Sequence, residues 1–152
     1  MNDTIQNGIG ILANIASHNI FGPDNIIAGC WSDGIYFGPT ETDSNIIIGN
    51  TIVGNTLNGI YFTSGIYNNR IGGYNPGEGN TIIRNTQNGI YIYANSDSNQ
   101  VIGNRIGGNM AQQNDGNGDN GVLIDLERPS PAGVMRSTIT TWNPPARLRL
   151  AR

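Results

Sequence analysis

Short apolar runs rich in Ile alternate along the chain with turns rich in Asn and Gly. One phrase, an Asn or Asp followed by Gly and three largely apolar residues, occurs five times, at residues 7–11, 33–37, 58–62, 88–92 and 120–124. The intervals between these phrases are 26, 25, 30 and 32 residues. Strands this short, bounded by Asn-Gly or Gly-Asn and recurring at such intervals, predict a chain that coils through three sheets and stacks each coil on the one before.

A second Asn-bounded phrase supplies the other strands of each unit, at residues 45–55 in one unit and at 69–73 and 80–85 in the next. Two other repeat architectures of similar period fit less well. A leucine-rich repeat requires a Leu and Asn pattern, and the chain holds only six Leu. The blade of a common β-propeller is longer, at roughly 40 residues. A solenoid of short strands is therefore the predicted fold.

Alternation within the first phrase predicts which side chains face the core. If Ile35, Ile60, Ile90 and Val122 point inward, the residues two positions later do so too, namely Phe37, Phe62, Ile92 and Ile124. The intervening Tyr36, Tyr61 and Tyr91 then point outward. Because stacked strands lie about 4.8 Å apart, these three residues are expected to form an exposed aromatic row, with Gly10 below it and Leu123 above it.

The polar residue that opens each phrase is expected to stack at a turn of the coil. Its members are Asp33, Asn58, Asn88 and Asn120. Neighbouring amides can hydrogen-bond along the coil axis, as they do in other stacked sheets. Asn tolerates the left-handed conformation and the Gly that follows it permits a positive φ. We interpret these positions as scaffold.

The unit resembles the right-handed parallel β-helix repeats of the pectin-lyase-like superfamily. The resemblance is carried by Ile-Gly-Gly, Pro-Gly-x-Gly-Asn and Asn-Gly-Ile units like those of large bacterial surface and secreted proteins; it is closest over residues 69–92 and covers roughly 4–125. It implies an all-β, right-handed parallel β-helix of about five short coils within residues 1–126. That superfamily includes lyases, hydrolases, epimerases, adhesins and inert spacers, so the fold alone selects no function.

Composition and charge exclude several classes of protein. Asn, Ile and Gly number 23, 23 and 22 of the 152 residues, which disfavours helix. A net charge of −3 with no Lys argues against nucleic-acid binding. No apolar window of about 18 residues exists to span a membrane. The single Cys30 cannot form an intramolecular disulfide. The chain contains no signal peptide, so its compartment stays open, and the resemblance suggests a secreted or surface location if the chain is a fragment.

The composition changes near Glu127. Residues 127–152 hold five of the eight Arg, four of the seven Pro and one acid, for a charge of about +4, whereas residues 1–126 carry about −7. Residues 134–142 and 147–150 alternate as strands do. This tail is expected to cap the last coil or to pair with the open end of another chain, which favours a dimer, or to fray. Met1 is expected to fall in the middle of a coil. A further hypothesis is therefore that the chain is a segment of a β-helix carried as a small mobile gene.

Catalytic signatures are sparse. The resemblance implies that a hydrolase would carry an Asp-Asp pair with Gly-His-Gly, yet the chain has no such pair and its one histidine, His18, stands between Ser and Asn. Two arginines, Arg70 and Arg105, occupy matching Asn-Arg-Ile-Gly-Gly positions, and Arg84 lies in the same stretch. The nearest acids, Glu78 and Asp97, are expected in loops. A minimal polysaccharide lyase or hydrolase using these arginines remains the alternative reading.

One segment looks like the start of a calcium-binding loop. The alternating oxygen ligands Asp115, Asn117 and Asp119 suit a hard cation. The pattern departs from such a loop at Asn120, where a Gly belongs, and at Leu126, where a bidentate Glu belongs. A flexible polar loop is the competing interpretation, so calcium is only a weak cofactor candidate.

The row of Tyr36, Tyr61 and Tyr91 is the best candidate for ligand binding, because each exposed tyrosine offers an apolar body and a polar hydroxyl to a sugar. Its competing interpretation is structural, since tyrosine is a favoured cross-strand residue. We therefore expect a non-catalytic binding or assembly module, with a glycan or surface polymer as ligand and self-association through the tail or the open coil ends. A purely structural, self-associating segment is the third reading.

Overall fold

The computed structural model describes residues 7–39, 41–107, 121–125, 139–141 and 148–151. These residues form fourteen strands and no helix. The strands build three sheets, here called A, B and C. Sheet A contains β1 (Ile11–Ala13), β4 (Ile35–Phe37), β7 (Ile60–Phe62), β10 (Ile90–Ile92), β12 (Val122–Asp125) and β14 (Leu148–Ala151). Sheet B contains β2 (Ile20–Phe21), β5 (Ile46–Ile47), β8 (Arg70–Gly72), β11 (Gln100–Ile106) and β13 (Ile139–Thr141). Sheet C contains β3 (Ile26–Ala28), β6 (Thr51–Val53), β9 (Thr81–Ile83) and the end of β11.

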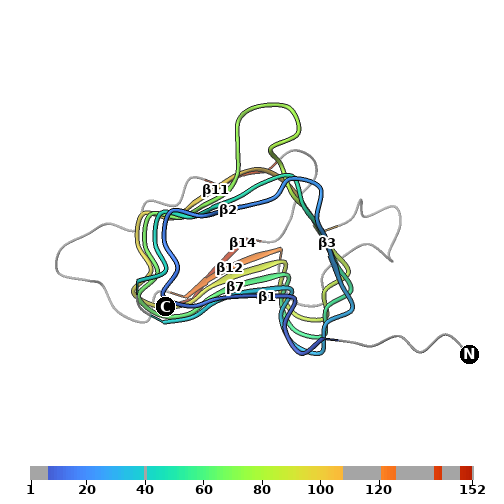
Figure 1. Cartoon of the computed structure of the whole chain (residues 1–152), viewed down its shortest axis with the longest axis horizontal. Helices are drawn as coiled ribbons and strands as arrows, with labels where there is room; N and C mark the ends of the chain where they lie inside the picture. The colour runs from blue at the N-terminus through green and yellow to red at the C-terminus, as the bar shows by residue number, and fades with distance from the viewer. Residues whose placement is uncertain (1–6, 40, 108–120, 126–138, 142–147, 152) are drawn as a thin grey trace, which may run out of the picture.

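All pairings among these strands are parallel and connect successive coils. Figure 1 looks along the coil axis, with sheet A below, β2 and β11 above and β3 at the side. Between β1 and β12 the chain completes four turns. The predicted all-β solenoid is confirmed.

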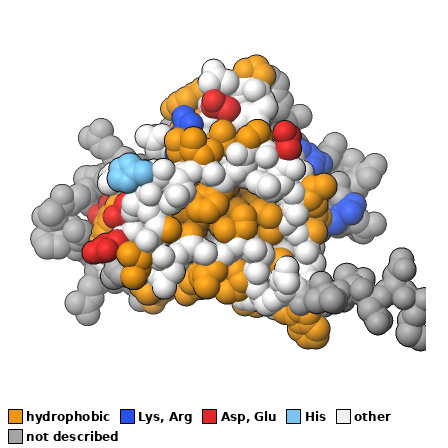
Figure 2. Space-filling view, in the orientation of Figure 1, with side chains coloured by type: hydrophobic (Ala, Val, Ile, Leu, Met, Phe, Trp, Pro, Cys, Tyr) orange, Lys and Arg blue, Asp and Glu red, His pale blue; other side chains and the backbone are white. Residues whose placement is uncertain are grey.

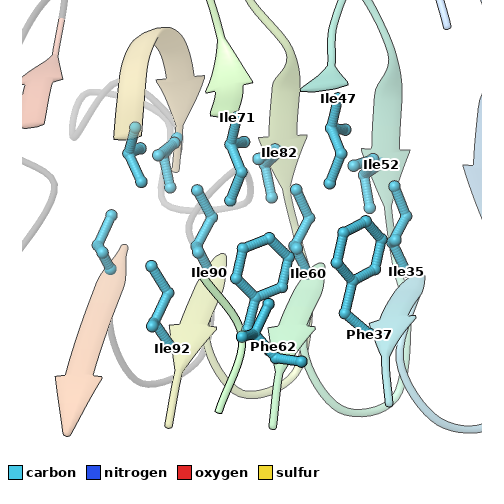
Figure 3. Close-up of a cluster of buried hydrophobic side chains, with 14 of the residues drawn as sticks. Ile35, Phe37, Ile47, Ile52, Ile60, Phe62, Ile71, Ile82, Ile90 and Ile92 are labelled. Carbon is cyan, nitrogen blue, oxygen red and sulfur yellow. The ribbon is translucent and has the colours of Figure 1, made fainter. Parts of the chain in front are cut away.

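The core fills the space between the three sheets with Ile and Phe. Ile35, Ile60, Ile90, Phe37, Phe62 and Ile92 are 0% exposed, and Val122 and Ile124 are 1% exposed, which confirms the predicted inward set. Side chains from sheets B and C meet them in the middle, among them Ile47, Ile52, Ile71 and Ile82 (Figure 3). The rings of Phe37 and Phe62 stack with their centroids 4.7 Å apart. Each such side chain contributes about 1.5–3 kcal/mol by burial.

The predicted register of the first phrase is wrong by two residues. Ile11 pairs with Ile35, and Leu12 with Tyr36, so Leu12 and not Gly10 lies beneath the tyrosine row. In the observed register Gly10 takes the crowded corner position. A Cβ on Gly10 would lie 2.6 Å from the carbonyl oxygen of Gly34, whereas a Cβ on Gly8 would meet nothing within 4 Å. Gly10 is therefore the counterpart of the later phrase glycines.

The predicted reason for those glycines is also corrected. The phrase glycines Gly34, Gly59 and Gly89 do not have positive φ, and neither do the polar residues Asn58 and Asn88 before two of them. A Cβ on Gly59 would lie 2.6 Å from both the carbonyl oxygen of Gly89 and a methyl carbon of Ile82. Glycine is required here because the next coil approaches closely, and the chain does not need left-handed backbone at this corner.

The predicted polar stack is confirmed for its described members. The side-chain oxygen Oδ1 of Asp33 accepts hydrogen bonds from the backbone N–H and Nδ2 of Asn58, at 3.0 and 2.8 Å. Asn88 bonds in the same way to Oδ1 of Asn58. Asn120 lies outside the described residues.

Three further ladders were not predicted. In each ladder, the side-chain Oδ1 of an Asn accepts a hydrogen bond from the backbone N–H of the equivalent residue in the preceding coil. Their members are Asn19, Asn45, Asn69 and Asn99 in the first; Asn25, Asn50, Asn80 and Asn104 in the second; and Cys30, Asn55 and Asn85 in the third. The missed signal is a five-residue spacing, as in Asn45, Asn50 and Asn55. It places one amide at each corner of the coil.

Two strands of the segment 127–152 lie at the C-terminal end of the solenoid. In β13, Ile139 pairs with Val101 of β11. In β14, Leu148 pairs with Val122 and Leu150 with Ile124. Sheet A therefore continues by one strand beyond the last phrase. Whether this segment also joins two chains stays a prediction.

Candidate functional site

The outer face of sheet A carries the predicted tyrosine row. Tyr36, Tyr61 and Tyr91 occupy one register column, because β4, β7 and β10 pair residue for residue. All three side chains are partly exposed, and the residues on either side of each are buried. The ring centroids of Tyr36 and Tyr61 are 5.5 Å apart with an interplanar angle of 75°. Those of Tyr61 and Tyr91 are 5.0 Å apart at 21°. The structure thus brings the three predicted residues together.

Apolar residues extend this row at both ends. Leu12 precedes Tyr36 in the column and is 61% exposed. Leu123 follows Tyr91 and is partly exposed. Tyr93, two residues beyond Tyr91, packs edge to face against it with centroids 6.0 Å apart. We call Leu12, Tyr36, Tyr61, Tyr91 and Leu123 the sheet A column.

The outward columns that begin at Ile20 in sheet B and at Ile26 in sheet C become polar after the first coils. In sheet B the column runs Ile20, Ile46, Arg70 and Gln100. In sheet C it runs Ile26, Thr51, Thr81 and Arg105, and a second outward column of sheet C, formed by Ala28, Val53 and Ile83, stays aliphatic over three coils. Among these columns of described residues, only that of sheet A stays aromatic or aliphatic over five coils. An apolar stripe of this length on one face favours an interaction surface.

Ring stacking changes how the tyrosines can meet a ligand. Tyr61 and Tyr91 cover part of each other's faces, because their planes are nearly parallel at 5.0 Å. The column therefore presents mainly ring edges and phenol groups, with the exposed Leu12 at one end. Such a surface suits a ligand that combines apolar C–H groups with many hydroxyls better than a flat aromatic ligand.

The arginines do not share one position on the coil, contrary to the predicted match. Arg70 pairs with Gln100 in sheet B, whereas Arg105 pairs with Thr81 in sheet C. The two Asn-Arg-Ile-Gly-Gly phrases fall one corner apart, because β11 runs without a loop from sheet B into sheet C. Arg84 lies at a third place, exposed at a corner with a φ of 57°.

The carboxylate of Glu78 is hydrogen-bonded within the loop to which Glu78 belongs. Residues 73–78 form a loop that projects from the coil (Figure 1). The carboxylate of Glu78 accepts hydrogen bonds from the side-chain amide and the backbone N–H of Asn75, at 2.8 and 3.3 Å. These bonds, with a smaller contribution from the charge of Arg70, lower the pKa of Glu78. Glu78 is therefore ionised at neutral pH and is unsuited to protonate a leaving group.

The remaining sequence candidates form no catalytic or metal cluster in the described part of the chain. His18 is exposed, and its backbone N–H bonds to the carbonyl oxygen of Asp43. Cys30 is buried, and desolvation raises the pKa of its thiol. Over the described ranges no three His, Cys, Asp or Glu gather as metal ligands. The calcium candidates Asp115, Asn117 and Asp119 lie outside those ranges.

Comparison with known proteins identifies the family. A model described as the right handed beta helix region matches residues 2–128. The chain belongs to the right-handed β-helix family. No curated protein and no solved structure matches this β-helix. Where the chain is described, it holds no helix with the length and apolar character needed to cross a membrane.

Proposed function

We propose that this β-helix is a non-catalytic binding module that holds a glycan or a similar surface polymer along the sheet A column. The observation that carries the proposal is the register of Tyr36, Tyr61 and Tyr91, which places one phenol on each of three successive coils. A polymer of repeating units can meet such a repeating row at several points. Weak contacts to single units then add along the chain.

The chemistry of the column supports this class of ligand. A sugar ring offers apolar C–H groups beside hydroxyls, and tyrosine offers an apolar ring edge beside a phenol. The five residues of the sheet A column carry no charge, and the first charged residue in this register is Arg149 of β14, next to Leu123. Tyrosines already ordered by stacking lose little side-chain entropy on binding.

The separation of charged groups argues against the alternative, a polysaccharide lyase or hydrolase. Arg70, Arg84 and Arg105 occupy sheet B, a corner and sheet C respectively. The carboxylate of Glu78 is engaged by Asn75. A glycosidase would require two carboxyl groups flanking one bond, and we find no such pair around the sheet A column in the described coils.

Affinity gel electrophoresis against neutral and acidic polysaccharides tests the proposal. The parent is expected to be retarded by at least one polymer, and the triple variant Tyr36→Ala, Tyr61→Ala, Tyr91→Ala is expected to lose that retardation. A triple Tyr→Phe variant keeps the stacked rings and separates the phenol contribution from the ring contribution. The control is Tyr67→Ala with Tyr74→Ala, which removes two exposed tyrosines outside the column.

Each result has a distinct meaning. Thermal melting must first show that the alanine variant is folded, and the Tyr→Phe variant covers the case in which it is not. Retardation that survives in both column variants would overturn the proposal. Polymer that is shortened after incubation with the parent would support the lyase or hydrolase instead. Parent protein that no polymer retards would favour a purely structural segment.

A further inference from the structure

The coil that begins the described chain presents unpaired strand edges in all three sheets. The strands β1, β2 and β3 each stand at the end of their strand order and pair on one side only. Hydrophobic positions that are sealed in later coils are partly open here. Ile11 is only partly buried, whereas its column partners Ile35, Ile60 and Ile90 are 0% exposed. Figure 2 looks onto this end and shows apolar side chains at its centre and along parts of its periphery.

The rim of this end is unusual for a surface. Ile20 is 64% exposed and Ile26 is 77% exposed, although both lie on edge strands. Edge strands that remain free normally carry charges, proline or a covering segment that blocks pairing. An apolar rim around an open core is instead the pattern of a surface that is covered by another coil.

The asparagine ladders give this end a hydrogen-bonding polarity. Oδ1 of Asn45 and Oδ1 of Asn50 each accept hydrogen bonds from the preceding coil. The equivalent Asn19 and Asn25 are exposed, and within the described residues their Oδ1 atoms accept no hydrogen bond. At these two corners the end therefore offers unused side-chain acceptors, in addition to the backbone N–H and C=O groups of its unpaired strand edges. At these corners a second copy of the same end would place acceptors against acceptors.

Charge selects the opposite end as the partner. Residues 1–69 hold five acids and no Arg or Lys, and among them Asp24, Glu41 and Asp43 lie in the first two described coils. Residues 127–152 hold five Arg and one acid, and this segment supplies the end strands β13 and β14. Arg149 lies within β14. Two copies of the acid-bearing end would repel each other, whereas that end attracts the end that carries Arg149.

We propose that copies of this β-helix assemble head to tail, with β1 and β2 of one copy seated on β14 and β13 of a second copy. The register columns continue across such a joint. Leu148 and Leu150 follow the inward column positions of Val122 and Ile124, and Ile11 and Ala13 begin the same two columns. The joint uses two different surfaces, so association does not close and copies add in a row. The proposal is independent of polymer binding.

Complementation between two blocked variants tests the assembly. The N-end variant Ile20→Lys with Ile26→Lys places edge lysines on exposed positions and opposes the arginines of the partner. The C-end variant Leu150→Pro removes an edge N–H. Every second residue of a sheet A strand directs its N–H to the following coil, as Ile60 and Ile90 do. Leu150 occupies one of these alternating positions, so its N–H faces away from β12 and its removal leaves the pairing with β12 intact. Arg149→Glu is a second C-end variant that leaves the backbone donor in place. Tyr74→Lys is the matched control, since Tyr74 is 75% exposed on the 73–78 loop.

Sedimentation velocity over a range of concentrations gives the readout. The parent and Tyr74→Lys are expected to rise well above the 16.3 kDa monomer mass with increasing concentration, and each blocked variant alone is expected to stay at that mass. An equimolar mixture of the N-end and C-end variants is expected to reach twice the monomer mass and to stop there. A parent that stays monomeric, a blocked variant that still associates alone, or a mixture of folded variants that stays monomeric would overturn the proposal.

Discussion

At the scale of single residues, the asparagine ladders have two opposite polarities. Oδ1 of Asn80 accepts from Asn50 in the coil before it, and its Nδ2 donates to the carbonyl oxygen of Ile47 and to Oδ1 of Asn104. At the fourth corner the direction reverses, because Oδ1 of Asp33 accepts from Asn58 in the coil after it. An acid is tolerated at Asp33 because its carboxylate acts only as an acceptor, from Asn58 and from the hydroxyl of Ser32. An interior position such as Asn80 must both accept and donate.

This difference predicts unequal effects of two exchanges between Asn and Asp. Asn80→Asp is expected to lower the free energy of unfolding by roughly 2–4 kcal/mol at pH 7, because a buried carboxylate would face two oxygens that now receive hydrogen bonds. The loss is expected to shrink at lower pH, since repulsion raises the pKa of the new carboxyl and its protonated form can donate. Asp33→Asn is expected to change stability by less than about 1 kcal/mol. Urea unfolding at pH 7 and pH 4 measures both, and equal losses in the two variants would contradict the ladder polarity.

The register of the first coil gives a second prediction at this scale. Gly10→Ala is expected to destabilise the protein by about 1–3 kcal/mol, because the new Cβ would lie 2.5 Å from a methyl carbon of Ile27 and 2.6 Å from the carbonyl oxygen of Gly34. Gly8→Ala is the control two residues away, where a Cβ meets nothing, and its effect is expected within about 0.5 kcal/mol. Thermal unfolding of the two variants decides the register. The reverse order of stability would restore the register that the Asn-Gly phrase predicts.

At the scale of elements, the number of residues between two corner asparagines determines whether a segment spans one side of the coil or also forms a loop. Four residues separate Asn45 from Asn50, and four separate Asn99 from Asn104. Ten residues separate Asn69 from Asn80. The surplus of six corresponds to residues 73–78, the projecting loop, because Gly72 pairs with Ile102 and the backbone N–H of Gly49 bonds to the carbonyl oxygen of Glu78. The loop is therefore an insertion into a corner that is otherwise complete.

Deletion of residues 73–78 is accordingly expected to leave the fold intact. The shortened chain reads Asn69-Arg70-Ile71-Gly72-Gly79-Asn80, which restores four residues between the corner asparagines, so stability should change by less than about 1 kcal/mol. Deletion of residues 73–79 is the control. It leaves only three residues and should cost more than about 3 kcal/mol, because Asn80 can no longer reach its ladder. Circular dichroism with thermal unfolding compares them, and collapse of the six-residue deletion would show that the loop is structural.

At the scale of the whole molecule, the long sides and the ends of the solenoid have different properties. The sheet A column is a side surface that repeats with each coil, so a longer stack would offer a longer row of tyrosines. The two terminal segments of the sequence differ in charge, with five acids and no cation in residues 1–69 and five arginines and one acid in residues 127–152. Head-to-tail assembly would therefore bring successive tyrosine rows into line, with Leu123, Arg149 and Leu12 between Tyr91 of one copy and Tyr36 of the next. The proposed polymer binding uses a side of the solenoid and the proposed self-association uses its ends, with Leu12 of β1 at their boundary, so the two can be measured separately.

The amino-acid sequence by itself determined the class of fold and the facing of the later strands. The repeated phrases predicted a parallel solenoid, the buried set from Ile35 to Ile124 and the outward tyrosines, because strand alternation is a local property with a period of two. The sequence also predicted the stack of Asp33, Asn58 and Asn88. Most of the candidate binding row was therefore visible before the structure.

Only the tertiary structure decided which residues stand above one another. It placed Leu12 instead of Gly10 below Tyr36, separated Arg70 from Arg105, and closed Glu78 onto Asn75. Register between coils depends on contacts between residues about 25–30 positions apart, such as the approach of the Gly89 carbonyl to Gly59. A repeated phrase shows that coils exist, but it does not show how an insertion or an alternative glycine shifts one coil against the next. Steric fit between neighbouring coils makes that choice.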